Sequence, residues 1–193
     1  AGAVSVLVMS GETDEAILAA AERKLRRDMF KIIELLRARF PEFKDSAVVS
    51  SAINAGIRET RHIEGIRTLT VDQILNCEVP EDSIMLAANS VDVHGKYGPK
   101  SNEYITIPEG KCYGVPYGTM IPPAFSNLAV AGRPISADCE AAGAIRVMPP
   151  CMGIGQAAGT AVAMAVLGGY DLRTLDVKAL REKLSADGVM LEA

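Results

Sequence analysis

The segment 148–169, MPPCMGIGQAAGTAVAMAVLGG, is the feature that most limits how this chain can fold. From Ile154 to Leu167 it is a run of small and apolar residues, which predicts a helix packed closely against a sheet. The Gly-Gly pair that follows predicts a left-handed cap at the end of this helix. The small residues ahead of Ile154 predict a turn that leaves backbone N–H groups exposed at the positive end of the helix dipole.

The glycines of this segment resemble the spacing of a dinucleotide-binding loop but differ from it in two ways. Such a loop needs a strand directly before GxGxxG, and here the preceding residues are RVMPPCM. Two consecutive prolines cannot donate hydrogen bonds to a strand ladder. Gly153, Gly155 and Gly159 also form GxGxxxG, which is one residue too long. We therefore predict a packed helix whose exposed start suits an anion or a polarised carbonyl, and no pyrophosphate loop.

Elsewhere the hydrophobic periodicity predicts alternating strands and helices of a mixed α/β (α+β) fold. Apolar residues at helical spacing predict a long helix over Glu15–Arg39, which Pro41 ends. Further helices are expected after Thr70, within 138–147 and over 176–188. Strands are expected over 4–9, 47–53, 83–94, 103–108 and 127–132, with a loop after His94 and an extended connection over 112–126. A shift in composition near residues 110–125 predicts two domains, 1–115 and 116–193.

Composition narrows the classes of function. A net charge of −4 argues against a surface that binds nucleic acid or an anionic membrane. The longest apolar run, 157–167, is shorter than the roughly 20 residues that span a bilayer, so we expect no membrane partner. The first residues have no basic head, so we expect no signal peptide and a cytoplasmic location. The cysteines form no CxxC pair, and with two histidines in the chain a metal site is not expected.

Several segments, taken in order, resemble one family of flavoproteins. They are AGIRETRHIEGIRTLT, SVDVH, VPYGTMIP, NLAVAGRPISAD and AIRVMPPCMGIGQAAGTAVAMA. Together they resemble the C-terminal half of FAD-dependent oxidoreductases similar in fold to the glutathione-reductase and fumarate-reductase type. The resemblance covers roughly residues 47–170. It implies part of an FAD-binding domain and part of a substrate domain with a mixed sheet.

The resemblance implies a cofactor site around two segments. NLAVAGR would be the returning strand, whose end at Gly132 and Arg133 passes the ribityl and phosphate region of FAD. The helix that begins near Gly153 would aim its N-terminus at the N1–C2=O edge of the flavin. The candidate cofactor-binding residues are thus Gly132, Arg133, Gly153, Ile154, Gly155 and Gln156. A helix dipole would stabilise the anionic reduced flavin, and glycine would permit close approach.

The chain departs from the family pattern because it contains no strand followed by GxGxxG. We therefore expect either a fragment or one of two chains, with the missing N-terminal half as its partner. Alone, the chain should bind FAD weakly or not at all and be inactive. The uncovered apolar edge at NLAVAG predicts association with itself or a partner. A protein that uses FAD without redox chemistry, and an inactive remnant that serves as a binding or assembly module, stay open.

Candidate catalytic residues lie in two motifs. In GIRETRHIEG, Arg58 and Arg61 could bind an anionic small molecule, because guanidinium offers paired donors; the alternative is a salt-bridged strand edge. In SVDVH, Asp92 and His94 point the same way on a strand, so Asp92 could orient His94 for proton transfer. The alternative is a structural histidine. Arg61 and Tyr117 are weaker candidates for the proton transfer.

Three residues near the predicted helix start have more than one possible role. Arg146 could meet substrate or flavin, or pair with Glu140. Cys139 and Cys151 flank the expected flavin side, but no cysteine pair has redox spacing, so a disulfide-reductase mechanism is not supported. We interpret these two cysteines as small buried residues.

Overall fold

The computed structural model describes residues 15–57, 59, 61–94 and 102–192 of the chain. These form two units, residues 1–60 and 61–193, which are described separately. The predicted strand over 4–9, most of the loop after His94, and Arg58 lie outside the described residues. The predicted domain boundary near residue 115 falls inside the second unit and stays a prediction.

The first unit is a long amphipathic helix with an extended segment along it. Helix α1 runs over Glu15–Arg39, as predicted, and a 3-10 turn at Pro41–Phe43 follows it. Its apolar stripe is only half-buried, and none of its residues is fully buried. The unit therefore has little core of its own among the described residues.

The predicted strand over 47–53 is wrong. This segment is extended but irregular, and Val49 and Ile53 are 97% and 84% exposed. Its β-branched residues favour a strand only where a neighbouring strand and a packed face support them, and no described strand pairs with it. Side chains of α1 hold it instead: Arg26 donates to the Ile53 carbonyl at 3.0 Å, and Glu22 accepts from the Ala55 N–H at 3.0 Å.

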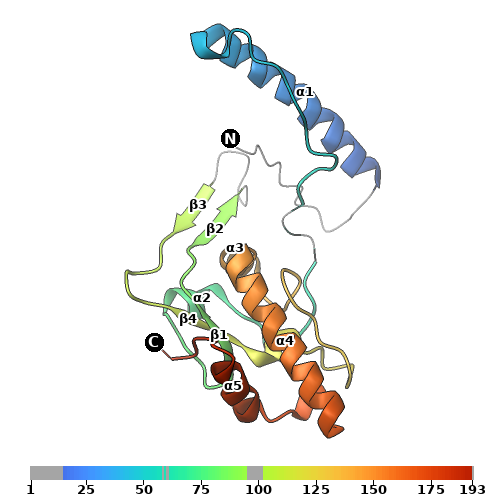
Figure 1. Ribbon diagram of the computed structural model, residues 1–193, viewed down its shortest axis with the longest axis vertical. Helices are drawn as coiled ribbons and strands as arrows, with labels where there is room; N and C mark the ends of the chain where they lie inside the picture. Colours follow the sequence, from blue (N-terminus) through green and yellow to red (C-terminus); the bar gives the residue numbers. More distant parts are fainter. Residues whose placement is uncertain (1–14, 58, 60, 95–101, 193) are drawn as a thin grey trace. The chain divides into compact units, whose positions relative to one another are not determined.

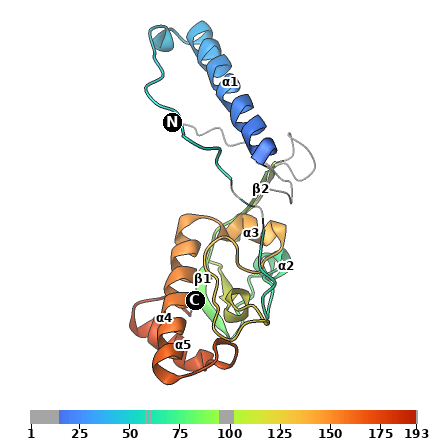
Figure 2. The ribbon, with the colours of Figure 1, turned by 90° about the vertical axis from the view of Figure 1, so that its right-hand side faces the viewer.

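The second unit contains the hydrophobic core. Strands β1 (Ser83–Ala87) and β4 (Tyr113–Pro116) pair antiparallel, and β2 (Val91–His94) pairs antiparallel with β3 (Asn102–Ile105). Helix α4 (Met148–Gly168) packs on β1, and α5 (Val177–Ala186) lies beside α4 (Figure 1; Figure 2). The arrangement confirms the mixed α/β class. Fully buried side chains include Leu69, Ile84, Met120, Ile145, Ile154 and Leu180.

One aspartate joins two helix starts. Thr70 caps α2 (Val71–Leu75), as the sequence predicts, and the Gln73 side chain completes a capping box. Helix α3 (Cys139–Ile145) is capped by Asp138, whose carboxylate accepts from the Ala141 N–H at 2.7 Å and the Val71 N–H at 2.8 Å. Because these donors belong to different helices, the carboxylate fixes α2 and α3 to each other.

Helix α4 begins earlier than predicted. Its first residue is Met148, so Pro149 and Pro150 lie in its first turn and Gly153 lies inside the helix. Proline suits this place because its fixed φ is helical and the N–H it lacks would have no partner within the helix. Only two of the four unbonded N–H groups that open a helix therefore exist here. The predicted C-terminal cap is confirmed, since Gly169 has a left-handed φ of 68°.

The estimate that no segment is long enough to cross a membrane is also wrong. Helix α4 has 21 residues and is apolar enough to cross one by length and composition. The core helices of soluble proteins meet the same criterion, and one face of α4 packs in the core of the second unit. The finding is therefore weak evidence for a membrane span.

The predicted buried strand over 127–132 is wrong as well. These residues form no strand in the described part of the chain, Gly132 has a left-handed φ of 81°, and Leu128 is 40% exposed. The Val130 N–H donates to the Met120 carbonyl at 2.9 Å, but no described strand runs along the segment. An apolar sequence of this kind forms a ladder only where a neighbouring strand supplies the other half of it.

Candidate functional site

The RHIEG part of the first motif lies beside the GRPIS segment. The Ile63 N–H donates to the Pro134 carbonyl at 2.9 Å, and His62 Nδ1 lies 2.8 Å from the Ile135 carbonyl oxygen. The segment of Arg61, a predicted catalytic residue, is therefore bonded to the segment that follows the predicted cofactor residues Gly132 and Arg133. Two motifs about seventy residues apart in sequence converge here.

His62 is a candidate that the sequence reasoning passed over. A carbonyl oxygen can only accept, so Nδ1 carries the proton of this hydrogen bond and the neutral ring keeps its lone pair on Nε2. The ring is half-buried. Its position in the motif was the available signal, but two arginines beside it drew the interpretation toward anion binding.

The start of α4 carries positive charge. No side chain caps Val147, the residue ahead of the helix, and Met148 is 80% exposed. Arg133 lies close enough to the first turn to act on Cys151: burial raises the pKa of that thiol, and the Arg133 charge lowers it in part. Gly132, just before Arg133, has a φ of 81°, which favours glycine. The helix dipole and the guanidinium thus act at one exposed surface.

The glycines of α4 have different surroundings from those predicted. A Cβ on Gly153 would lie 2.8 Å from Met85 Sδ, so Gly153 lets α4 approach β1 and does not clear the helix start. Ile154 is fully buried, so its side chain packs in the core, and its role toward a cofactor stays a prediction. Gly155 and Gln156 are exposed, and nothing lies within 4 Å of a Cβ on Gly155.

An exposed stripe runs the length of α4. We call it the open face of α4; its residues recur at alternating spacings of four and three, and therefore share one side of the helix. Met148, Met152 and Val166 are 80%, 74% and 75% exposed. Gly155 and Gly159 leave the middle of the stripe flat. The open face consists of Met148, Met152, Gly155, Gly159, Val162 and Val166.

The second motif, SVDVH, is connected to the residues before α4 by a hydrogen bond from Arg146. Arg146 follows α3, and its guanidinium donates to the Asp92 carbonyl on β2 at 2.6 Å. Strand β2 ends two residues later at His94, whose side chain lies outside the described part. The predicted proton-transfer strand is thereby tied to the turn that leads into α4.

The comparison with protein families identifies the family of the chain. A family model described as "FAD dependent oxidoreductase" matches residues 3–184. The chain belongs to this family. No curated protein and no solved structure matches it. The family is one of FAD-dependent oxidoreductases, which confirms the resemblance; the glutathione-reductase or fumarate-reductase subtype stays a prediction.

Tyr117 has a structural role in this oxidoreductase chain. It is 5% exposed, and its hydroxyl donates to the Leu172 carbonyl at 2.8 Å. Burial, and to a smaller extent the charge of Asp171, raises its pKa to about 12. A buried hydroxyl that already donates to the backbone is poorly placed for proton transfer to a substrate.

We expect Tyr117→Phe to destabilise the chain by about 1–2 kcal/mol at pH 8, because the buried Leu172 carbonyl loses its donor. Wild-type stability should also fall as pH rises from about 10 to 12: the native state keeps this proton, and an unfolded tyrosine releases it. The Tyr117→Phe variant should lose less stability over this pH range, because it has no hydroxyl to titrate. Urea unfolding at both ends of the range measures this, with Tyr170→Phe, at a 62% exposed tyrosine, as the control. Identical pH slopes in wild type and Tyr117→Phe would refute it.

The described residues give little support for a reactive cysteine or a metal site. All four cysteines are free and partly buried. The Cys151 thiol donates to the Ile145 carbonyl at 3.5 Å, and burial raises its pKa, which disfavours the reactive thiolate. No group of three or more potential metal ligands occurs in the part of the chain that the structure describes.

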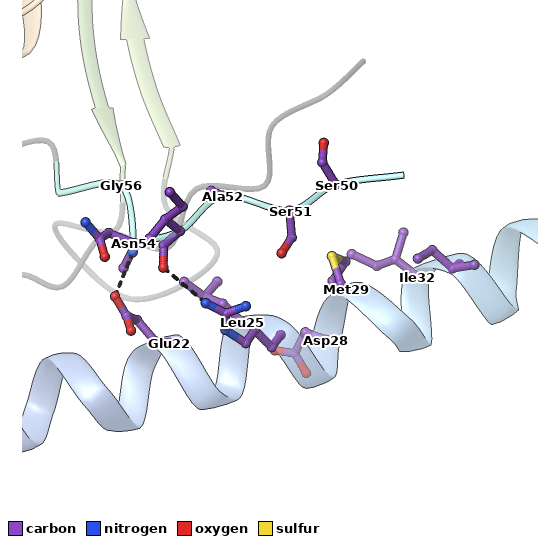
Figure 3. A pocket seen from close by; sticks show the side chains of 14 residues that line it. Glu22, Leu25, Asp28, Met29, Ile32, Ser50, Ser51, Ala52, Asn54 and Gly56 are labelled. Carbon is purple, nitrogen blue, oxygen red and sulfur yellow. Dashed lines mark hydrogen bonds between the residues drawn. The ribbon is translucent and has the colours of Figure 1, made fainter. Parts of the chain in front are cut away.

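The first unit contains an apolar cleft of about 440 Å³ between α1 and residues 50–56 (Figure 3). Leu25, Met29 and Ile53 contribute apolar lining. The charged groups along it are already engaged: Glu22 and Arg26 hold the extended segment, and Asp28 pairs with Lys24 at 2.7 Å. None of the predicted site residues lines this cleft.

Proposed function

We propose that this chain is the C-terminal portion of an FAD-dependent oxidoreductase and supplies its flavin-facing helix and substrate-side residues. The main support for the proposal is the start of α4. There an uncapped helix end and Arg133 put positive charge beside the exposed side chain of Met148. Such a surface suits a planar aromatic group that becomes anionic on reduction.

The chemistry of the residues at the start of α4 and in the GRPIS segment is suited to binding FAD. Gly132, with its left-handed φ, and Arg133 are proposed to meet the phosphate and ribityl region. The N–H groups at Val147 and Met148 are proposed to face the N1–C2=O edge, with Gly155 and Gln156 further along. FAD, when bound, would supply two-electron transfer. The chain's own contribution would be to orient the flavin and favour its reduced charge.

A segment carrying GxGxxG is proposed to complete the site, either on the same polypeptide or on a separate chain. Two apolar surfaces support a missing partner: the open face of α4 and residues 127–132, which lack a neighbouring strand among the described residues. A strand added along 127–132 would pair its backbone, and a helix could approach closely at Gly155 and Gly159.

The substrate side is proposed to lie at the first two motifs. Arg61, together with Arg58, would bind an anionic small molecule, and His94 would move the proton that accompanies electron transfer. His62 joins these candidates because it lies on the same segment as Arg61 and has a defined tautomer. The free cysteines are compatible with the reducing cytoplasm that we propose as its location.

Titration with FAD tests the proposal. We expect the purified chain to bind FAD weakly or not at all, and to bind it at sub-micromolar concentration, with a yellow flavin spectrum, once the strand–GxGxxG–helix segment encoded beside it is added. Sub-micromolar binding by the chain alone would contradict the need for a partner. No binding by the pair, or no such segment in the gene or a neighbouring frame, would contradict the proposal itself.

The second candidate is a catalytically inactive binding or assembly module. The exposed apolar side chains of α1, which include Phe30 and Leu35 at 56% and 54%, favour it. The same titration separates the two functions. A module would join its partner without taking up flavin, whereas the oxidoreductase pair would turn yellow and bleach on chemical reduction.

A further inference from the structure

Strand β2 lies against helix α3 and the residue that follows it, and the Asp92 carbonyl is one point where they meet. Within the described residues β2 pairs only with β3, so its other edge has no neighbouring strand. Arg146 Nη2 donates to the Asp92 carbonyl oxygen at 2.6 Å, and both residues are half-buried. A charge-assisted bond of this length is stronger than a neutral one, and it replaces a missing ladder bond.

Helix α3 contacts the same carbonyl at a second point. A Cβ on Gly143 would lie 2.8 Å from the Asp92 oxygen and 3.2 Å from its carbonyl carbon. Gly143 lies in the last turn of α3, and Arg146 follows that turn. Val91 and Val93, on either side of Asp92, are buried. The backbone of β2 is thus packed on α3 at Gly143, and Arg146, the residue after α3, donates a hydrogen bond to it.

Arg146 also stands directly before α4. It is the residue after α3, and only Val147 separates it from Met148. One side chain therefore links two parts of the proposed site: the strand that ends at His94, and the helix start assigned to the flavin. We propose that Arg146 is a positioning residue that fixes β2 against the start of α4. This inference rests on the proposed function, because the distance between β2 and the start of α4 matters for activity only if the flavin binds there.

Hydrogen exchange tests the structural half of the proposal in the 193-residue chain. Arg146→Ala should speed exchange of the β2 amides about ten-fold or more and leave α5 unchanged, whereas Arg146→Lys should restore much of the protection. Gly143→Ala should speed the same amides, because it displaces the same carbonyl. Arg181→Ala is the matched control: Arg181 also donates to a strand carbonyl, that of Ser83 on β1. It should leave β2 unchanged.

FAD affinity tests the functional half in the pair formed with the GxGxxG segment. Arg146→Ala should weaken FAD binding about ten-fold or more and shift the flavin absorbance. Arg181→Ala should stay within two-fold of wild type, and Arg146→Lys should recover part of the affinity. Unchanged β2 exchange in Arg146→Ala overturns the inference, and so does faster exchange with wild-type FAD affinity and spectrum. If the wild-type pair binds no FAD, the proposed function fails and the cofactor role of Arg146 fails with it, while exchange still decides whether Arg146 fixes β2.

Discussion

Gly65→Ala is expected to lower the free energy of unfolding of the chain by about 2–3 kcal/mol. A Cβ at this position would lie 2.7 Å from the Gly118 carbonyl oxygen and 2.9 Å from the Arg67 carbonyl oxygen. Both are backbone atoms that cannot turn aside as a flexible side chain does. Moving them would strain the bond from the Arg67 N–H to the Gly118 carbonyl, at 3.2 Å. Urea unfolding followed by circular dichroism measures the change.

Gly155→Ala is the matched control for this prediction. It is the same substitution in the same unit, but nothing lies within 4 Å of the added Cβ. Alanine is favoured over glycine inside a helix, so the control should be neutral or stabilise the chain by up to about 1 kcal/mol. Gly65→Ala within about 0.5 kcal/mol of wild type would show that the RHIEG segment does not need glycine for its packing.

Gly155→Leu is expected to separate binding from stability. The isolated chain should be as stable as wild type, because the position is exposed and leucine is a good helix former. FAD affinity of the pair with the GxGxxG segment should fall by about a hundred-fold or more. The reason is that leucine would fill the flat middle of the open face of α4, where we propose that cofactor or partner approaches closely. Fluorescence titration with FAD measures the loss.

Two variants control for the added bulk. Gly155→Ala adds one methyl group and should cost much less affinity than leucine. Glu182→Leu places an exposed leucine on α5, away from the open face of α4, and should leave FAD binding unchanged. Wild-type affinity in Gly155→Leu would remove this face from the cofactor site. Equal losses in both leucine variants would point to aggregation by exposed leucine.

Local signals in the sequence predicted the helices well. Helix α1 ends where its apolar periodicity ends, and the caps at Thr70 and Asp176 hold the first turns of α2 and α5. These features depend on residues within one or two turns of each other, so a single sequence contains the information. The order of the motifs also predicted the family, which the family model confirms.

The wrong predictions concern segments whose structure depends on distant partners. Residues 47–53 and 127–132 have strand-like sequences, but no described strand pairs with either. The predicted start of α4 comes too late because the run of small and apolar residues begins only at Ile154, whereas Pro149 and Pro150 suit a first helical turn. The part of the site formed by His62 and Arg146 could not be predicted, since it depends on the Ile135 and Asp92 carbonyls, whose placement requires the folded unit.

The most direct test of the central claim is a crystal structure of the chain with FAD and the GxGxxG segment. We predict that the isoalloxazine ring lies at the start of α4, with its N1–C2=O edge toward the backbone of Val147 and Met148 and with Arg133 beside the cofactor. Flavin density in the cleft between α1 and residues 50–56, or a buried start of α4 that the cofactor does not reach, would contradict the account.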